Sequence, residues 1–307
     1  METPLLSIVT PSFNRAGMIA NAIESVLAQD YPHYEHIVVD GASTDDTLEV
    51  LARYPHLRVL SEKDRNMFDA LNKGFKMARG TFVAWLNTDD VYPPGAFATI
   101  AKAIAGHPDA QAISGAAEHF EMTESGPRTL MKERPIDAQD FWQRVVEAPV
   151  PNGWFFRTSL FEKVGYFNIE LPFVADRDLI IRICLEGIRP VPVEQVVYCY
   201  QQHAGSFNFY PEDSRHPVYG PQRMRINTDD LKMLDLFFKQ GGLPPEVLRV
   251  MRRQNSLYAY RLASTAFYHR KWEQFRAAMR SGFRYDPLFV FALGRYALRR
   301  LVKGGKR

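Results

Sequence analysis

Cysteine is nearly absent from this chain. Among its 307 residues only Cys184 and Cys199 are cysteines, and both stand in apolar surroundings. Two isolated cysteines supply neither a disulfide framework nor a structural zinc site, and their scarcity fits a reducing cytosol.

Long apolar runs are missing as well. No stretch reaches the ~18 continuous apolar residues that suggest a membrane-spanning helix, and the run Leu288–Leu293 soon meets Arg295. The apolar segment Leu5–Thr10 is too short for a signal peptide and has no basic region before it. We therefore expect a cytoplasmic protein.

The common phosphate-binding motifs are also missing. Neither G-x-x-x-x-G-K-[ST] nor G-x-G-x-x-G follows the first apolar segment. Their absence argues against ATP hydrolysis and against ordinary dinucleotide binding.

The composition is ordinary, but the charge is unevenly placed. Hydrophobic residues make up 46% and charged residues 24%, as in globular proteins, and the length suggests roughly two domains. The net charge is +3, yet Pro244–Arg307 contains 15 Lys or Arg against three acids, which gives +12 there and −9 elsewhere. This asymmetry predicts an acidic, metal-using front part and a tail attracted to anionic surfaces.

Strand and helix patterns alternate over residues 5–90. Short apolar segments that predict buried strands occupy Leu5–Thr10, which Pro11 ends, and then His36–Val39, Arg58–Leu60 and Thr81–Asn87. Apolar residues at helical spacing run from Ile19 to Leu27 and from Met67 to Arg79, and Ser43 or Thr44 could cap a helix between them. This order predicts an α/β fold with a mainly parallel sheet and helices on both faces.

Polar clusters follow three of these strands, in Thr10–Asn14, Asp40–Asp45 and Asn87–Asp90. The carboxyl ends of parallel strands meet at one edge of the sheet, where ligands gather. Neighbouring carboxylates repel each other unless a cation or donor groups compensate them. Asp89 and Asp90 are suitable oxygen ligands for Mg²⁺ or Mn²⁺ carrying phosphates; the alternative is a polar turn before Pro93.

A set of motifs occurs in a fixed order along the chain. They are Thr10–Arg15, Val38–Asp45, Ser61–Arg65, Asp69–Gly74, Leu86–Asp90, Gly153–Arg157, and Ala175–Leu179 with Arg182. This ordered set resembles the inverting family 2 glycosyltransferases with the GT-A fold, and the resemblance covers roughly residues 5–206.

The resemblance implies a nucleotide site. Thr10 and Pro11 would lie along the base and ribose, and Asp40 would hydrogen-bond the base, a uracil in the commonest family members. Asp64 and Asn72 would also lie close to the nucleotide. The alternatives are a turn acid for Asp40, a solvated loop residue for Asp64 and a helix-surface residue for Asn72.

The resemblance also implies a metal site for Mg²⁺ or Mn²⁺. Asp89 would approach the ribose and Asp90 the metal, although Asn87 departs from the first position of the family's D-x-D motif. His203 would reach the metal or the diphosphate. The alternative is a hydrogen-bonded loop histidine.

Asp176 is the candidate general base, since matched family members have theirs at this position. It opens a predicted helix, Asp176–Ile183, so capping that helix is the structural alternative. Asp178 is the second candidate for the base, and Arg182 could steady either carboxylate. Trp154 could stack on an acceptor sugar or belong to the core.

We expect a GT-A catalytic domain at residues 1–207, with a nucleotide-sugar half at about 1–115 and an acceptor half at 116–207. A basic helical module, with helices at Leu231–Phe238, Glu246–Phe267, Lys271–Phe283 and Pro287–Val302, would follow at 208–307. Its last helix combines apolar and basic residues, which suits peripheral contact with an anionic membrane at the inner face of the cell membrane. A core-packed helix with a solvated basic face is the alternative.

The predicted function is metal-dependent, inverting transfer of a sugar from a nucleoside-diphosphate sugar to a glycan or lipid-linked acceptor. UDP is the first candidate for the nucleotide. A sugar-1-phosphate nucleotidyltransferase is an alternative, but it would be expected to carry a Gly-rich basic loop after the first strand, which Thr10–Gly17 lacks. A non-catalytic nucleotide-sugar-binding protein is another. Nucleic acid is not an expected partner, because the acidic front would repel phosphates.

Overall fold

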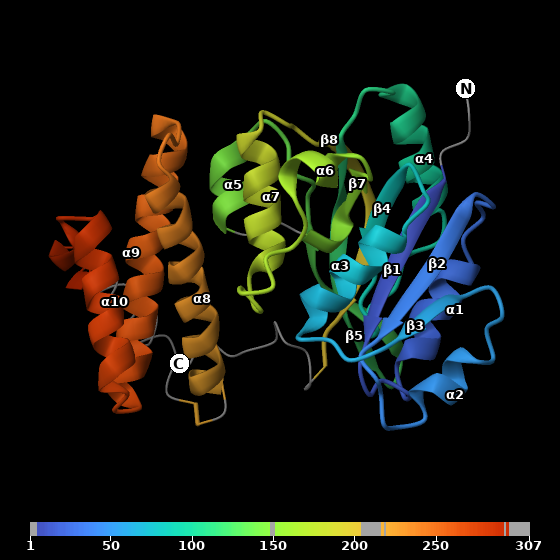
Figure 1. The fold of residues 1–307 in the computed structure, drawn as a ribbon, viewed down its shortest axis with the longest axis horizontal. Helices are drawn as coiled ribbons and strands as arrows, with labels where there is room; N and C mark the ends of the chain where they lie inside the picture. The colour runs from blue at the N-terminus through green and yellow to red at the C-terminus, as the bar shows by residue number, and fades with distance from the viewer. Residues whose placement is uncertain (1–4, 148–150, 204–215, 218, 292, 295–307) are drawn as a thin grey trace. The chain divides into compact units, whose positions relative to one another are not determined.

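The computed structural model describes residues 5–147, 151–203, 216–217, 219–291 and 293–294 (Figure 1). The chain divides into two compact units. The first consists of Met1–Phe141 and Ala148–Phe209, and the second of Trp142–Glu147 and Tyr210–Arg307. The predicted domain boundary between residues 207 and 208 lies outside the described residues.

The described part of the first unit forms an eight-stranded sheet in the order β3-β2-β1-β4-β7-β5-β6, with β8 paired to β5. The strands are β1 Leu6–Ser12, β2 Tyr34–Asp40, β3 Arg58–Ser61, β4 Phe82–Trp85, β5 Ala112–Thr123, β6 Gly126–Glu133, β7 Trp154–Arg157 and β8 Val191–Gln201. The four strands predicted from the sequence run parallel to one another, while β7 is antiparallel to both β4 and β5. The sheet is therefore mixed.

Helices cover both faces of the sheet, as the alternating pattern predicted (Figure 1). They are α1 Ile19–Leu27, α2 Thr47–Leu51, α3 Met67–Met77, α4 Ala96–Gly106, α6 Leu160–Val164 and α7 Ala175–Leu185. α3 packs so closely that a Cβ on Gly74 would lie 2.3 Å from a methyl group of Val9. Only glycine permits this approach of helix to strand.

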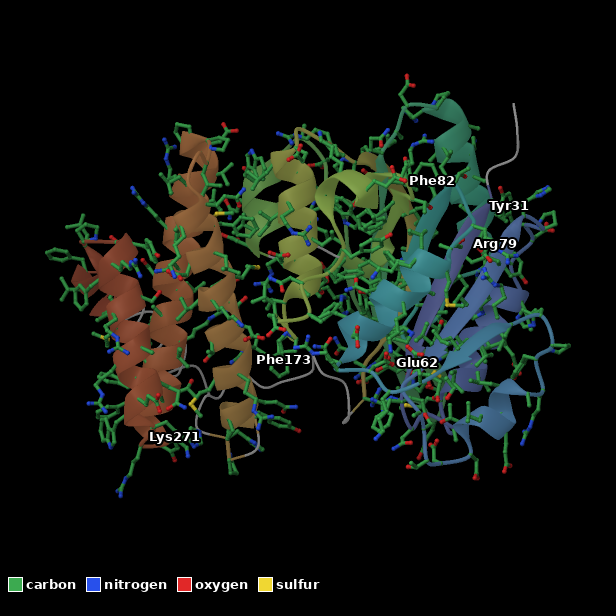
Figure 2. All side chains as sticks on the ribbon, viewed as in Figure 1. Tyr31, Glu62, Arg79, Phe82, Phe173 and Lys271 are labelled. Atoms are coloured by element: carbon green, nitrogen blue, oxygen red, sulfur yellow. The ribbon has the colours of Figure 1, made fainter. Side chains whose placement is uncertain are left out.

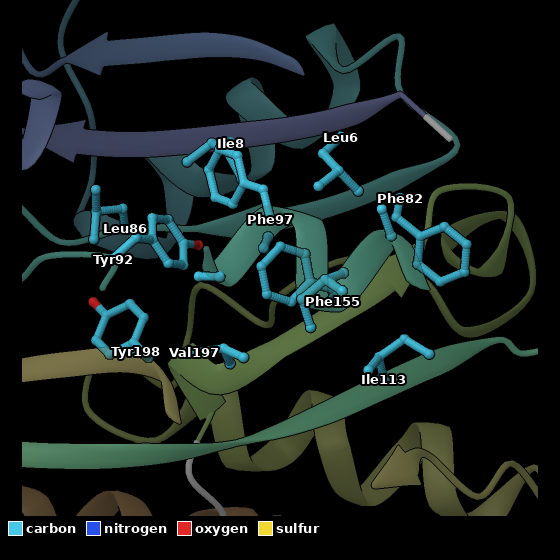
Figure 3. Close-up of a cluster of buried hydrophobic side chains, with 14 of the residues drawn as sticks. Leu6, Ile8, Phe82, Leu86, Tyr92, Phe97, Ile113, Phe155, Val197 and Tyr198 are labelled. Carbon is cyan, nitrogen blue, oxygen red and sulfur yellow. The ribbon is translucent and has the colours of Figure 1, made fainter. Parts of the chain in front are cut away.

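Aromatic and branched side chains form a core cluster between the sheet and α1 and α4 (Figure 3). Leu6 and Ile8 of β1 pack there with Phe97 of α4 and Tyr198 of β8, all buried. A second aromatic group lies beside α3, where Phe75 contacts Trp85 and Phe161. These two groups of packed side chains hold the parallel strands in place, and the polar clusters lie at the ends of those strands.

The structure corrects the predicted end of β1. β1 continues through Pro11 to Ser12 instead of ending at the proline. Leu86 donates its backbone N–H to the carbonyl of Val9, and the β1–β4 ladder goes no further than Val9 and Trp85. Pro11 is the next β1 residue that faces β4, so its missing N–H falls beyond the ladder.

The predicted capping of the second helix by Ser43 or Thr44 is also wrong. α2 begins at Thr47, after Asp46. Ser43 instead donates its backbone N–H and its hydroxyl to Asp40. Ser43 is therefore bonded to the buried carboxylate of Asp40 at the end of β2 and does not cap α2.

The second unit is helical. Its helices are α8 Tyr219–Gln240, α9 Pro245–Tyr268 and α10 Trp272–Tyr285, and most of the short α5, Phe141–Glu147, belongs to it. The predicted helices at 246–267 and 271–283 match α9 and α10 closely, while α8 begins earlier than Leu231. The predicted helix Pro287–Val302 lies partly outside the described residues. Among the helices that the structure describes, none combines the length and apolar character needed to cross a bilayer.

A buried histidine makes the first unit sensitive to acid. His36 of β2 lies within hydrogen-bond distance of Thr10, 2.9 Å from Oγ1 to Nε2. Burial, with a smaller contribution from His56, lowers the pKa of His36 from 6.5 to about 3. Because the folded state disfavours the protonated ring, stability is complete above pH 6.5 and falls as the pH decreases toward 3.

We predict that the free energy of unfolding decreases by about 1.4 kcal/mol between about pH 7.5 and about pH 5.5 because of this residue. Urea unfolding at the two pH values measures it. His36→Gln should remove most of this difference, whereas His107→Gln, at an exposed histidine of the same unit, should leave it intact. Equal pH dependence in both variants would contradict the assignment to His36.

Candidate active site

The loops after β1 and β2 are joined by hydrogen bonds. Asn14 donates its backbone N–H to Ser43 Oγ at 2.8 Å, and its side-chain oxygen accepts the N–H of Thr44 at 2.8 Å. Asn14 and Ala42 both adopt positive φ values, 53° and 61°, a conformation that non-glycine residues seldom adopt. The polar clusters Thr10–Asn14 and Asp40–Asp45 are therefore joined by hydrogen bonds at the edge of the sheet.

Asp40 ends β2 and is fully buried. Its carboxylate accepts the backbone N–H of Ser43 at 2.9 Å, the hydroxyl of Ser43, and the hydroxyl of Ser61 from β3 at 2.8 Å. These donors fix the carboxylate at the strand end. Asp40 is thus partly the turn acid of the alternative interpretation, while its position remains that of the predicted nucleotide contact.

Asp64 lies next to the loop that follows Asp40. A Cβ on Gly41 would be 3.3 Å from Asp64 Oδ2 and 3.3 Å from the ring of Phe13. Asp64 is a nearly buried partner of Lys73, with Nζ 2.6 Å from Oδ1, rather than a solvated loop residue. Burial raises the pKa of Asp64, and Lys73 opposes that rise.

Three of the predicted contacts use their side chains within the protein. The Thr10 hydroxyl pairs with His36, and Pro11 is buried in β1. Asn72 donates to the carbonyl of Phe167 and accepts its N–H, both at 2.9 Å. The amide of Asn72 therefore pins α3 to the loop before α7, and a nucleotide contact by this side chain stays a prediction.

Asp90 lies beneath the sheet edge, with only 4% of its surface exposed. Its Oδ2 accepts the hydroxyl of Tyr198 at 2.7 Å and the amide of Asn87 at 3.0 Å, and its Oδ1 accepts the N–H of Gln201 at 3.0 Å. Burial and the charge of Asp89 raise the pKa of Asp90 to about 7. We refer to this arrangement of Asp90, Asn87, Tyr198 and Gln201 as the Asp90 clasp.

Asp89 occupies a more open position than Asp90. Its side chain is 28% exposed, and Oδ2 lies 3.2 Å from Nε2 of His203. No group of three or more His, Cys, Asp or Glu side chains in the described part of the chain could hold a metal ion unaided. His203 thus contacts the partly exposed Asp89, whereas Asp90 is buried.

Asp176 and Asp178 open α7 but have different surroundings. Asp178 is buried against Arg182, with Nε 2.9 Å from Oδ2, and Arg182 also donates to the carbonyls of Val164 and Tyr166. Asp176 is partly buried and accepts the N–H of Arg177 at 2.7 Å. Burial raises the pKa of Asp176, with Arg177 opposing the rise.

Tyr200 packs beside the Asp90 clasp. Burial, and then the charges of Asp90, Glu133 and Asp176, raise the pKa of this phenol. The ring of Tyr200 lies 4.7 Å from that of Tyr198, whose hydroxyl accepts the amide of Asn152 at 2.8 Å. The charges of Asp90 and Asp176, far apart in the sequence, thus both disfavour ionisation of the Tyr200 hydroxyl.

Residues that the sequence did not single out complete the edge. Phe13 is 57% exposed beside Gly41, and Tyr198 and Gln201 hold Asp90. The aromatic residue directly after a strand was a usable signal for Phe13, whereas the contacts of β8 had none. Trp154 is a core residue, fully buried and stacked on Phe156, so its proposed stacking on an acceptor sugar is wrong.

The chain resembles known proteins in sequence. The profile of Glycosyl transferase family 2 matches residues 7–165. An uncharacterized protein of Sinorhizobium fredii is 29% identical over 213 residues, 66% of this chain and 23% of that protein. A PGL/p-HBAD biosynthesis glycosyltransferase of Mycobacterium bovis is 26% identical over 216 residues, 68% of this chain and 81% of the relative.

Two solved structures share the fold. The mannosyltransferase PcManGT of Pyrobaculum calidifontis, in complex with GDP-Man and Mn²⁺, has a TM-score of 0.59 at 21% identity, covering 99% of this chain and 87% of the other. S. aureus TarS 1–349 in complex with UDP has a TM-score of 0.53 at 17% identity, covering 94% and 92%.

The fold is that of the GT-A enzymes, as expected from the sequence. The chain belongs to Glycosyl transferase family 2, whose profile matches just over half of it, and it is a glycosyltransferase.

The environment of Asp178 predicts a structural role. Asp178→Asn leaves the Arg182 guanidinium without its buried partner, so we expect the free energy of unfolding to fall by about 2–3 kcal/mol. This is somewhat less than the ~3–5 kcal/mol seen when a fully buried pair is broken, because Arg182 is 25% exposed. Urea unfolding measures the change.

Glu170→Gln is the matched control, since Glu170 pairs with Arg65 at the surface and should cost less than ~1 kcal/mol. A loss of stability in Asp178→Asn no larger than in this control would contradict the structural role.

Proposed function

We propose that this glycosyltransferase moves a sugar from a nucleoside-diphosphate sugar, with UDP as the first candidate nucleotide, to a hydroxyl group of a glycan or lipid-linked saccharide. The reaction is a single displacement that inverts the anomeric carbon and depends on Mn²⁺ or Mg²⁺. The observation that carries the proposal is the 3.2 Å contact between Asp89 and His203, because it pairs two metal-binding side chains above the Asp90 clasp.

Asp89 and His203 would hold the metal ion, and this changes the assignment made from the sequence. Both carboxylate oxygens of Asp90 already accept hydrogen bonds from the protein, whereas Asp89 is partly open. Two protein ligands suit an ion whose remaining positions are filled by diphosphate oxygens and water. Their mixed oxygen and nitrogen donors fit Mn²⁺ better than Mg²⁺, which prefers oxygen. The ion would supply positive charge for the departing diphosphate.

Asp90 positions the metal site. Through Gln201 it holds the end of β8, from which His203 follows two residues later, and through Asn87 it holds the turn that carries Asp89. A carboxylate that joins both segments fixes the spacing of the two ligands. This explains why the buried Asp90 lies behind Asp89, the proposed metal ligand.

The nucleotide would lie along the ends of β1 and β2. Phe13 supplies an exposed aromatic face for stacking of the base, and Asp64 Oδ2, beside the same Gly41, would accept an N–H of the ring. Asp40 already accepts hydrogen bonds from Ser43 and Ser61 with both oxygens, so it would reach the base only by exchanging one of these donors. Ser12 Oγ and Asn87 Oδ1 are buried, and neither has a hydrogen-bond partner among the described residues. Thr10 and Pro11 shape the floor beneath. The UDP bound to TarS and the GDP-Man bound to PcManGT support a nucleoside diphosphate here.

Asp176 is the proposed general base. It would take the proton of the acceptor hydroxyl while the acceptor oxygen bonds to the anomeric carbon and the bond to the diphosphate breaks. A carboxylate with a raised pKa is a stronger base, and burial raises the pKa of Asp176. Asp178 is unsuited to the role because Arg182 occupies it.

The acceptor and the location belong to the same proposal. The mycobacterial relative is described as a biosynthesis glycosyltransferase, which supports a glycan or lipid-linked acceptor. We place the protein in the cytoplasm, at the inner face of the cell membrane, where such acceptors are assembled from nucleotide-activated sugars.

We predict that UDP stabilises the protein only when Mn²⁺ is present. A thermal-shift panel of UDP, GDP, CDP, dTDP and ADP, with and without Mn²⁺, measures this, and about 2.7 kcal/mol is expected at ~100 times the Kd. Asp89→Asn should abolish the metal-dependent shift. Asp109→Asn, at an exposed residue away from the edge, should retain it. A shift with GDP alone would change the proposed donor, and no shift with any of the five nucleotides would contradict the proposed nucleotide site.

We predict that Asp176→Asn lowers kcat by ~10²–10⁴-fold, the usual contribution of a general base, while the UDP–Mn²⁺ thermal shift is unchanged. Release of UDP in the presence of UDP-sugars and candidate acceptors measures turnover. Near-normal turnover in this variant would exclude Asp176 as the base.

A further inference from the structure

The helix α10 has an unusual distribution of residue sizes. Its buried residues are Ala278 and Gly282, whereas its large side chains Trp272 and Phe283 are exposed. Helices of globular proteins normally bury large apolar side chains and expose small or polar ones. α10 is therefore built to pack closely on one side and to present aromatic groups on the other.

The turn between α9 and α10 gathers further aromatic and basic side chains. Phe267, Tyr268 and Trp272 are 58%, 55% and 51% exposed, and the rings of Phe267 and Trp272 lie 5.7 Å apart. Arg270 and Lys271 lie between them, both exposed, and Lys271 marks the turn in Figure 2. We call Phe267, Tyr268, Arg270, Lys271 and Trp272 the tip cluster.

Cationic side chains continue from the tip cluster along the outer face of α10. Arg276 and Arg280 follow Trp272 at intervals of four residues, so they lie on the same face of the helix, and both are exposed. Neither forms an ion pair with another described residue. Glu273 is the one acidic residue of α10. Like charges four residues apart destabilise a helix unless an anionic partner compensates them.

We propose that the tip cluster and the outer face of α10 bind the surface of an anionic lipid bilayer. Tryptophan, tyrosine and phenylalanine favour the boundary between headgroups and acyl chains, and arginine and lysine favour anionic headgroups. A soluble polyanion would satisfy the cations but leave the three exposed aromatic rings in water. The bilayer satisfies both sets. The inference rests on the membrane-side location in the proposed function and assigns that contact to particular residues.

The surface overlaps only in part with the one expected from the sequence. That expectation placed the membrane contact on Pro287–Val302, with Phe289 among its apolar residues. Phe289 is fully buried, and a Cβ on Gly282 would lie 2.3 Å from its ring. Phe289 thus anchors the chain to α10, and residues 295–302 lie outside the described part. Leu288, Val290 and Phe291 of that segment are 64%, 54% and 72% exposed, and further exposed aromatic and basic groups lie on the α9–α10 turn and on α10 itself.

Flotation of the full chain with lipid vesicles tests the inference. We expect binding to vesicles of phosphatidylcholine mixed with phosphatidylglycerol, weak binding to pure phosphatidylcholine, and weakening by salt. Arg276→Gln combined with Arg280→Gln should lower the partition coefficient about 30-fold, from about fivefold per cation. Phe267→Ser with Trp272→Ser should weaken binding even at low salt. Fluorescence of Trp272 should shift to shorter wavelength on binding, and Trp272→Phe should lose most of that shift.

Arg53→Gln combined with Arg79→Gln is the matched control, because it removes the same charge from exposed positions in the first unit. It should bind like the unchanged protein. Circular dichroism checks that every variant is folded. Equal weakening in the control, binding to heparin but not to vesicles, or an unchanged Trp272 spectrum would each overturn the inference. Because the UDP–Mn²⁺ thermal shift is measured without lipid, a failure of vesicle binding leaves the proposed transferase site standing, and the reverse also holds.

Discussion

The candidate site depends on one buried carboxylate. Asp90 would be unfavourable in the interior without donors, since an uncompensated buried charge is costly. Three donors from two distant segments meet that requirement, namely Asn87 beside it and Tyr198 and Gln201 from β8. The bonds therefore hold the turn after β4 against the end of β8. Backbone bonds between Val91 and Cys199 strengthen the same junction.

The Asp90 clasp also explains how chemistry is distributed over the first unit. The parallel strands β1, β2 and β4 supply the side on which a nucleotide would rest, and β8 brings His203 to Asp89. Tyr198 accepts a hydrogen bond from Asn152, and its ring packs against that of Tyr200. Buried polar networks of this kind are stable when every member has a partner. The network thus extends from Asp90 through Tyr198 to Asn152 in the core.

The helix α10 of the second unit shows a different balance of burial and exposure from the first unit. In the first unit aromatic side chains such as Phe75, Trp85 and Phe156 fill the space between sheet and helices. In the second, α10 packs through Ala278 and Gly282 and leaves Trp272 outside. Close packing through small residues frees large ones for another partner. The chain could in this way carry the candidate active site on its first unit and the proposed bilayer-binding surface on its second.

The sequence by itself determined the parallel strands β1 to β4, their connecting helices and the polar clusters at their ends, because these follow from local periodicity and from the geometry of parallel strands. It also supported the family through ordered motifs. Tertiary structure alone decided that Asp90 is buried while Asp89 contacts His203, and that Arg182 pairs with Asp178 and not with Asp176. It also decided that Asn72 bonds the backbone of Phe167 and that Trp154 is a core residue. Each of these choices depends on a partner distant in the chain or on burial by other elements, and a local pattern contains no record of either.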